Sequence, residues 1–116
     1  MDRLEVMKLL MRRELAMEEL EVEVFLALLR GQNATSSEIM EQLNLTKEEF
    51  IKIAKDLESK GMIIELNMNE FRALHPRFAI VNRYRKMCVS NKIEFKKNPK
   101  IDRLAVQVEK YQESIE

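Results

Sequence analysis

The sequence is poor in residues that interrupt regular structure. Of 116 residues only two are Gly and two are Pro, and Trp is absent. All-β architectures need more turn residues than this, so the composition predicts a mainly helical protein. The length supports one ordinary domain, or one small domain with an added helix.

Cysteine and long apolar runs are scarce as well. The single Cys88 excludes an intramolecular disulfide framework. No apolar run approaches the roughly 20 residues that a membrane-spanning helix needs. No amino-terminal apolar stretch with a small-residue cleavage site marks export. We therefore expect a cytoplasmic protein without a membrane partner.

The residue patterns of enzymes and metal sites are also missing. The sequence has no Gly-rich phosphate loop, nucleophile elbow or catalytic constellation. His75 and Cys88 are the only residues of their types, whereas a metal site usually needs three or four clustered ligands. We expect no enzymatic activity, no metal and no other cofactor.

Two Thr-x-x-Glu patterns mark the starts of two short helices. Thr35 stands three residues before Glu38, and Thr46 stands three residues before Glu49. In such a capping box the hydroxyl and the carboxylate each accept a hydrogen bond from a backbone N–H that the helix leaves unpaired. Gly61 can adopt the left-handed conformation that ends the second helix.

The neighbouring segments complete a recognisable order. Residues 63–66 and 70–74 predict two strands with an Asn-rich turn between them. Further helices are predicted at residues 2–14, 18–30, 77–88 and 98–115, with residues 32–34 connecting the second helix to the third. Helix, tight turn, helix and hairpin is the order of a winged helix-turn-helix. We predict a mainly α fold with a small β-hairpin wing (α+β).

The charges are balanced overall but unevenly placed. The net charge is zero, yet residues 1–58 carry −5 and residues 59–116 carry +5. Residues 72–103 hold ten cationic side chains and only two acidic ones. Because the local field steers association, one face of the fold suits a polyanionic partner.

Candidate groove-binding residues lie on the helix predicted for residues 46–60. Its outward positions include Lys47, Ile51, Lys52 and Lys55, which are expected to enter the major groove. A solvated face laced with salt bridges is the alternative, because Lys52 has acidic residues four positions away on both sides.

Other candidates are expected to contact phosphates. Ser36 and Ser37 begin the preceding helix and are candidates for positioning the DNA backbone. The wing and the segment after it supply the cations expected to neutralise phosphates: Arg72, Arg77, Arg83, Lys86, Lys92, Lys96, Lys97 and Lys100. A basic surface that complements an acidic protein is the alternative.

The last predicted helix has a coiled-coil-like seam. Apolar residues recur three and four apart at Ile101, Leu104, Val108, Tyr111 and Ile115. An isolated helix of this length is only marginally stable, so either its own domain or a second copy must cover it. We favour a second copy, because a small winged-helix body has little surface left, and expect a homodimer. Residues 1–89 would then form the winged domain, and residues 90–116 a basic connection and the dimerisation helix.

Three stretches resemble the TrmB-like family of archaeal winged-helix transcription regulators. ELEVEVFLALLRG at 19–31 looks like the family's first helix, ATSSEI at 34–39 like the entry to its second helix, and LESKGMI at 57–63 like the exit from its recognition helix. The resemblance spans about residues 15–76. It implies DNA binding through residues 46–60 and the wing.

Two features depart from that family. The recognition helix opens with Lys47, Glu48 and Glu49, where the family often has Arg, Ser or other groove-binding residues. The chain also has no room for the large sugar-sensing domain of long members, so we do not expect sugar binding.

We therefore expect a homodimeric DNA-binding transcription regulator whose partners are double-stranded DNA, a second copy and the transcription machinery. The alternative is a winged-helix adaptor in a transcription or other multiprotein assembly.

Overall fold

The computed structural model describes residues 2–31 and 35–115, so the predicted connection at residues 32–34 lies outside the described residues. The elements follow one another along the chain as α1 (Arg3–Glu14), α2 (Glu19–Arg30), α3 (Ser36–Leu43), α4 (Lys47–Ser59), β1 (Ile63–Asn67), β2 (Glu70–Ala73), α5 (Pro76–Ser90) and α6 (Pro99–Ser114). The fold class predicted from the sequence is confirmed: the protein is mainly helical with a two-stranded antiparallel hairpin.

The predicted helix starts are present. Thr35 Oγ1 accepts from the N–H of Glu38 at 3.2 Å, and Thr46 Oγ1 accepts from that of Glu49 at 3.1 Å. Glu49 Oε1 in turn accepts from the Thr46 N–H at 3.0 Å, and these bonds hold the pKa of Glu49 below its ordinary value. Gly61, at φ 79°, follows α4 in the left-handed conformation. Local sequence signals therefore fix both ends of α4.

The wing packs on α4 through its inner face. Ile63 pairs with Ala73, and Glu65 pairs with Phe71, in an antiparallel register that is interrupted between Glu65 and Asn67. The Phe71 ring meets the ring of Phe50 on α4 edge to face, with 6.1 Å between centroids. The aromatic contact fixes how the wing lies beside α4.

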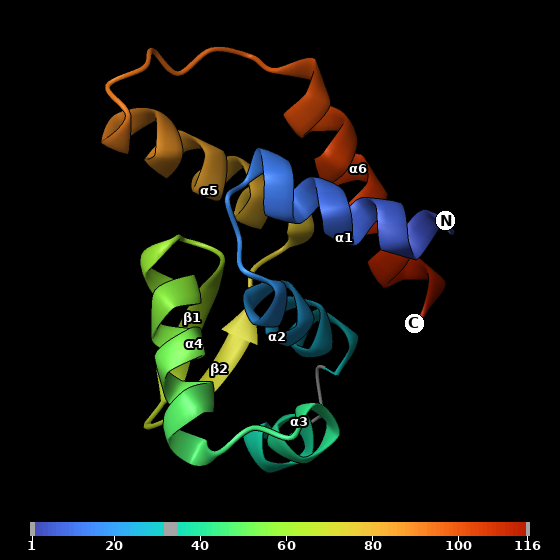
Figure 1. Ribbon diagram of the computed structural model, residues 1–116, viewed down its shortest axis with the longest axis vertical. Helices are drawn as coiled ribbons and strands as arrows, with labels where there is room; N and C mark the ends of the chain where they lie inside the picture. The colour runs from blue at the N-terminus through green and yellow to red at the C-terminus, as the bar shows by residue number, and fades with distance from the viewer. Residues whose placement is uncertain (1, 32–34, 116) are drawn as a thin grey trace.

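The molecule is built around α2. Figure 1 shows α3, α4 and the hairpin at one end of the long axis, and α1, α5 and α6 at the other, with α2 between them. Val22, Phe25 and Leu26 of α2 are at most 1% exposed. Leu20 differs: the apolar periodicity of residues 18–30 includes it, but it is 43% exposed.

The inward face of α5 matches the spacing of its larger apolar residues only in part. Phe78 and Cys88 share that spacing, but Phe78 is 67% exposed and Cys88 is buried, and Ala79 and Ile80 are also buried. α5 packs closely against α6, and its Arg83 reaches the backbone of Leu15 after α1. Two neighbours on different sides set the orientation, which periodicity along one helix does not reveal.

The seam of α6 is covered within the chain. Ile101, Leu104 and Val108 are at most 2% exposed and belong to the core that α6 shares with α1 and α5. The expectation that a second copy covers these three residues is therefore wrong, because the body has enough surface to cover them. Tyr111 is half-buried, and its hydroxyl accepts from Arg30 Nη1 at 3.0 Å. Ile115 is 42% exposed.

One carboxylate lies deep in the molecule. Glu21 is 3% exposed, and its Oε1 accepts from the N–H of Glu18 at 2.8 Å, which completes a capping box at the start of α2. The same carboxylate forms an ion pair with Lys60, the C-cap of α4. The sequence places Glu21 near the positive end of α2, but it gives no sign of a partner 39 residues away.

The buried seam leads to a stability prediction. Val108→Asp places a carboxylate at a fully buried position and should lower the free energy of unfolding by about 3 kcal/mol or more, since burying an unpaired charge is costly. Urea denaturation measures the change. Gln107→Asp, at the neighbouring exposed position, is the matched control and should change stability little. A Val108→Asp chain as stable as the control would contradict the assignment of this residue to the core.

Candidate nucleic-acid interface

The wing turn is held between α3 and the wing's own strand. Ser36 Oγ donates to the carbonyl oxygen of Asn69 at 3.2 Å, and the N–H of Asn69 donates to Glu65 Oε2 at 2.9 Å. Asn69 takes φ 61°, a value that Asn tolerates in tight turns. We expected Ser36 to contact a phosphate. Its hydroxyl instead donates a hydrogen bond within the protein and helps to position the wing.

Lys55 of α4 is neutralised by the chain itself. Its Nζ lies 2.8 Å from Glu65 Oε1 and 3.8 Å from Glu58 Oε1, and 5.7 Å from the centroid of the Phe71 ring. The hydrogen bond from Lys55 lowers the pKa of Glu65, and the same bond raises the pKa of Lys55. Both groups are charged at neutral pH, so a phosphate must compete with two carboxylates for this lysine.

The remaining candidates around α4 stand open to solvent. Lys47 and Lys52 are exposed on α4, and the structure shows no ion pair for either within its described residues. Ser37 is exposed in the first turn of α3, and Arg72 is exposed on the outer face of the wing. Ile51 is half-buried against the core, so only part of its side chain is open to a groove.

Arg77 and Arg83 have partners within the protein. Arg77 Nε donates to Glu109 Oε1 on α6 at 2.9 Å. Arg83 Nε donates to the carbonyl oxygen of Leu15 at 2.8 Å, and burial lowers the pKa of its guanidinium. Arg83 thus satisfies a carbonyl left unpaired at the end of α1 and holds α5 against it.

Most of the more distal cations lie at the other end of the molecule, whereas Lys86 borders Gly61 just after α4. Lys86 is on the second half of α5, and Lys92, Lys96 and Lys97 are on the connection at residues 91–98. Figure 1 shows this connection at the opposite end of the long axis from α3, and the molecule extends 38 Å in that direction. The sequence suggested one continuous basic segment beside the wing, but the structure separates it from the start of α4.

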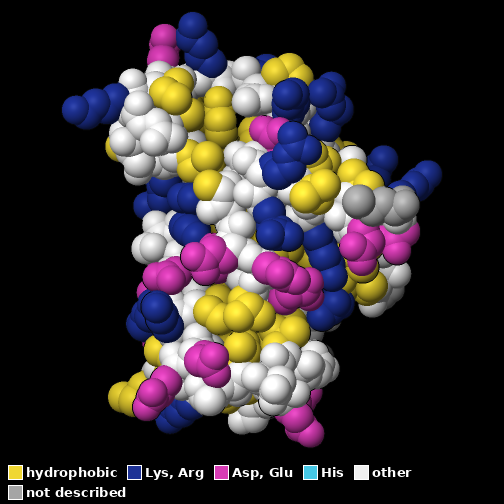
Figure 2. Space-filling view, in the orientation of Figure 1, with side chains coloured by type: hydrophobic (Ala, Val, Ile, Leu, Met, Phe, Trp, Pro, Cys, Tyr) yellow, Lys and Arg dark blue, Asp and Glu magenta, His cyan; other side chains and the backbone are white. Residues whose placement is uncertain are grey.

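Acidic side chains interrupt the surface around α4. Residues 35–60 contain four lysines and six acidic residues. In Figure 2 the Lys and Arg side chains gather mainly over the half that holds α1, α5 and α6, and Asp and Glu side chains cross the middle of the view. The lysines of α4 therefore form a small basic patch with acidic neighbours.

The outer face of the wing carries an apolar stripe that was not singled out from the sequence. Ile64, Leu66 and Met68 are 41%, 47% and 88% exposed. Ile64 and Leu66 of β1 alternate with Ile63 and Glu65, which point inward, as strand geometry requires, and Met68 follows in the turn. That alternation was the available signal, since every second residue from 64 to 68 is apolar.

Comparison with known proteins identifies the family. The family model described as "Sugar-specific transcriptional regulator TrmB" matches residues 6–86. The chain belongs to the TrmB family. The match runs from α1 into α5 and includes the whole helix-turn-helix and wing, so the TrmB-like resemblance is confirmed and the chain is a member of a transcription regulator family. Neither the curated proteins nor the solved structures gave a match.

Two other features of the described chain bear on its chemistry. No group of three or more His, Cys, Asp or Glu residues in residues 2–31 and 35–115 is arranged to hold a metal ion. Over the same residues, no helix is both long enough and apolar enough to cross a membrane.

Because Glu65 holds Lys55 in an ion pair, we expect that removing the charge of Glu65 tightens DNA binding. Glu65→Gln keeps an oxygen for the N–H of Asn69 but removes the nearer of the two carboxylate charges that hold Lys55, leaving Glu58 Oε1 at 3.8 Å, so the lysine becomes more available to a phosphate. Fluorescence anisotropy with a random duplex should show tighter binding and a salt dependence steeper by about 0.9 in slope, one additional phosphate contact. Glu70→Gln, which removes an exposed charge from the same wing, is the control. Equal effects of the two substitutions would show that Lys55 is not released.

Proposed function

We propose that this TrmB-family chain regulates transcription by binding double-stranded DNA with α4 in the major groove and the hairpin wing beside it. The observation that carries the proposal is the winged helix-turn-helix, in which α4 presents Lys47 and Lys52 to solvent with no ion pair among the described residues. A helix of this kind fits the width of the major groove. Membership of a transcription regulator family supports the same conclusion.

The proposed contacts are fewer than the sequence suggested. Lys47 and Lys52 would contact the groove or its phosphates, and Ser37 and Arg72 would contact the flanking backbone. Lys55 joins them only when a phosphate displaces Glu65. Within residues 2–31 and 35–115 no ion pair involves Lys47, Lys52 or Arg72. If each neutralises one phosphate, the salt dependence has a slope of about −3, since each neutralised phosphate contributes about −0.9.

We also propose that the protein acts as a homodimer. A dimer presents two copies of α4, which must be about 34–36 Å apart to meet successive major grooves on one side of DNA. The buried part of the α6 seam does not serve this contact. On the terminal helices, Val6 of α1 and Ile115 beyond α6 are exposed apolar residues open to a second copy. Light scattering should give twice the 13.8 kDa mass of one chain, and the mass of a single chain would contradict the dimer.

An adaptor function is the second candidate. Glu48 and Glu49 at the start of α4, and the exposed apolar stripe Ile64, Leu66 and Met68 on the wing, favour a basic protein partner with apolar side chains. Such a partner would replace DNA on the same end of the molecule. Duplex binding therefore distinguishes the two functions.

A gel shift with matched charge changes tests the DNA-binding proposal. Lys52→Glu should weaken binding to every duplex about equally and reduce the magnitude of the salt slope by about 1, as expected for a phosphate contact. Lys110→Glu makes the same change in net charge at an exposed site on α6 and should leave affinity close to that of the wild type. Binding that is insensitive to salt, or equally weakened by both substitutions, would favour the adaptor.

A further inference from the structure

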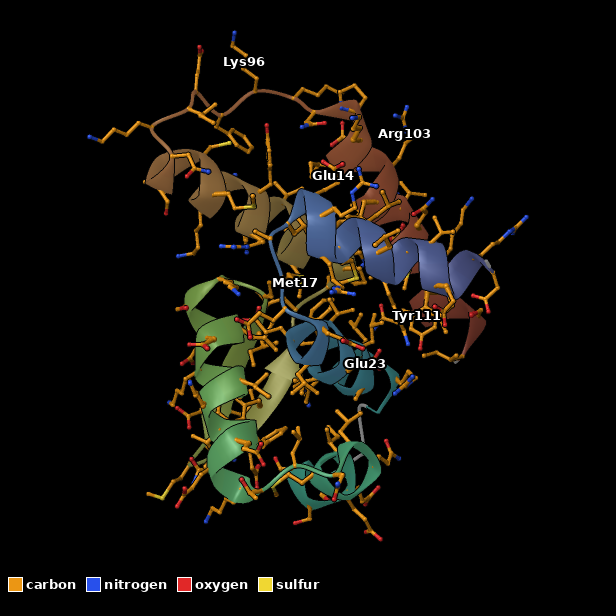
Figure 3. The ribbon with its side chains drawn as sticks, viewed as in Figure 1. Glu14, Met17, Glu23, Lys96, Arg103 and Tyr111 are labelled. Carbon is orange, nitrogen blue, oxygen red and sulfur yellow. The ribbon has the colours of Figure 1, made fainter. Side chains whose placement is uncertain are left out.

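The end of the molecule far from α3 is strongly basic. We call the basic end the cationic side chains of the second half of α5, the connection at residues 91–98 and the start of α6. All of them are exposed: Arg85, Lys86, Lys92, Lys96, Lys97, Lys100 and Arg103. Only Glu94 and Asp102 oppose them within residues 85–103. Figure 3 shows Lys96 and Arg103 pointing away from the body.

Little inside the protein neutralises these charges. Lys96 lies 3.6 Å from Glu94, with both side chains more than 70% exposed, and such pairs are weak in water. Arg85 lies over the ring of Phe95, 5.0 Å from its centroid. No other ion pair to the basic end is found within the described residues. By contrast, Lys55 at the other end already has two carboxylate partners.

A duplex bound along α4 does not meet the basic end on a continuous positive surface. Asp56 and Glu58 lie in the last turns of α4, where Lys86 of the basic end borders Gly61, and Figure 2 shows acidic side chains across the middle of this view. Phosphates passing that point would face like charges at short range, which costs affinity. The basic end is therefore oriented toward a different polyanion.

We propose that the basic end is a second DNA-binding surface that holds the phosphate backbone of another duplex, so that one chain bridges two duplexes. This inference rests on the proposed function of α4. Lysine supplies five of the seven cations, and a compact, flexible ammonium neutralises phosphate without reading sequence. The second surface is accordingly independent of DNA sequence, whereas α4 supplies any sequence preference.

An acidic protein segment is the competing occupant. Val89 and Ile93 are 73% and 60% exposed beside the cations, and apolar side chains of this kind often mark protein interfaces. Lysine, however, is depleted from such interfaces and is a regular phosphate ligand. The number of lysines favours DNA.

A capture assay tests the bridge. Beads carrying one duplex are incubated with the protein and a fluorescent second duplex, and retained fluorescence is measured. The test variant combines Lys92→Glu, Lys96→Glu and Lys97→Glu. The control variant combines Arg3→Glu, Arg13→Glu and Lys110→Glu, three exposed sites that give the same change in net charge.

The wild type and the control variant should retain the second duplex. The test variant should bind the bead-bound duplex within about twofold of the wild type, because distant sites act independently, and should lose the second duplex. Retention by the test variant would overturn the proposal, since the two α4 helices of a homodimer would then explain the bridge. So would a wild type that binds the bead-bound duplex but retains no second duplex.

Two further results are informative. Poly-glutamate bound by the wild type in place of the second duplex, and lost in the test variant, would assign the surface to an acidic protein and overturn the DNA proposal. A wild-type protein that binds no duplex even at low salt would refute the proposed function itself. If the protein binds the bead-bound duplex but does not capture the second one, the proposed function of α4 is not contradicted.

Discussion

The ion pair between Glu21 and Lys60 joins the centre of the molecule to the end of α4. Glu21 also completes the capping box of α2, and the Asn82 side chain of α5 donates to the carbonyl oxygen of Gly61 at 3.0 Å. Three helices thus meet at one corner. A buried charge that loses its partner is strongly destabilising, so α2 and the end of α4 remain in contact here only while both Glu21 and Lys60 are present. The direction of α4 depends on it.

The elements of the fold could be predicted because their signals are local. Thr35, Thr46, Gly61 and the Asn98-Pro99 pair act on their own neighbours in the chain, and the structure begins or ends helices at these positions. The covering of α6 could not be predicted in the same way. Periodicity shows that a helix has an apolar stripe, but not which surface covers it. Here α1, almost a hundred residues earlier, helps to cover it.

The candidate site was predictable only at the level of residue type. A lysine or arginine in the sequence shows that a positive charge is present, but it does not show which carboxylate or carbonyl group the side chain contacts in the fold. Lys55, Arg77 and Arg83 find partners 10, 32 and 68 residues away. The run of cations after the wing was also correctly seen, but its position relative to α4 depends on the path of α5. Clustering in sequence and clustering in space are separate properties.

The packing of α1 against α6 has a consequence for how the protein is made. Contacts among α2, α3, α4 and the hairpin can form once the chain has emerged to about residue 74. α1 can meet α2 early, but its contact with α6 forms only after residues 99–114 have followed. Domains fold progressively as they leave the ribosome, and contacts distant in sequence form slowly. The segment that we propose binds DNA therefore assembles first, whereas the packing of α1, in which Met7 and Met11 are buried, is completed only when α6 has emerged. Until then the apolar side chains of α1 are open to incorrect association.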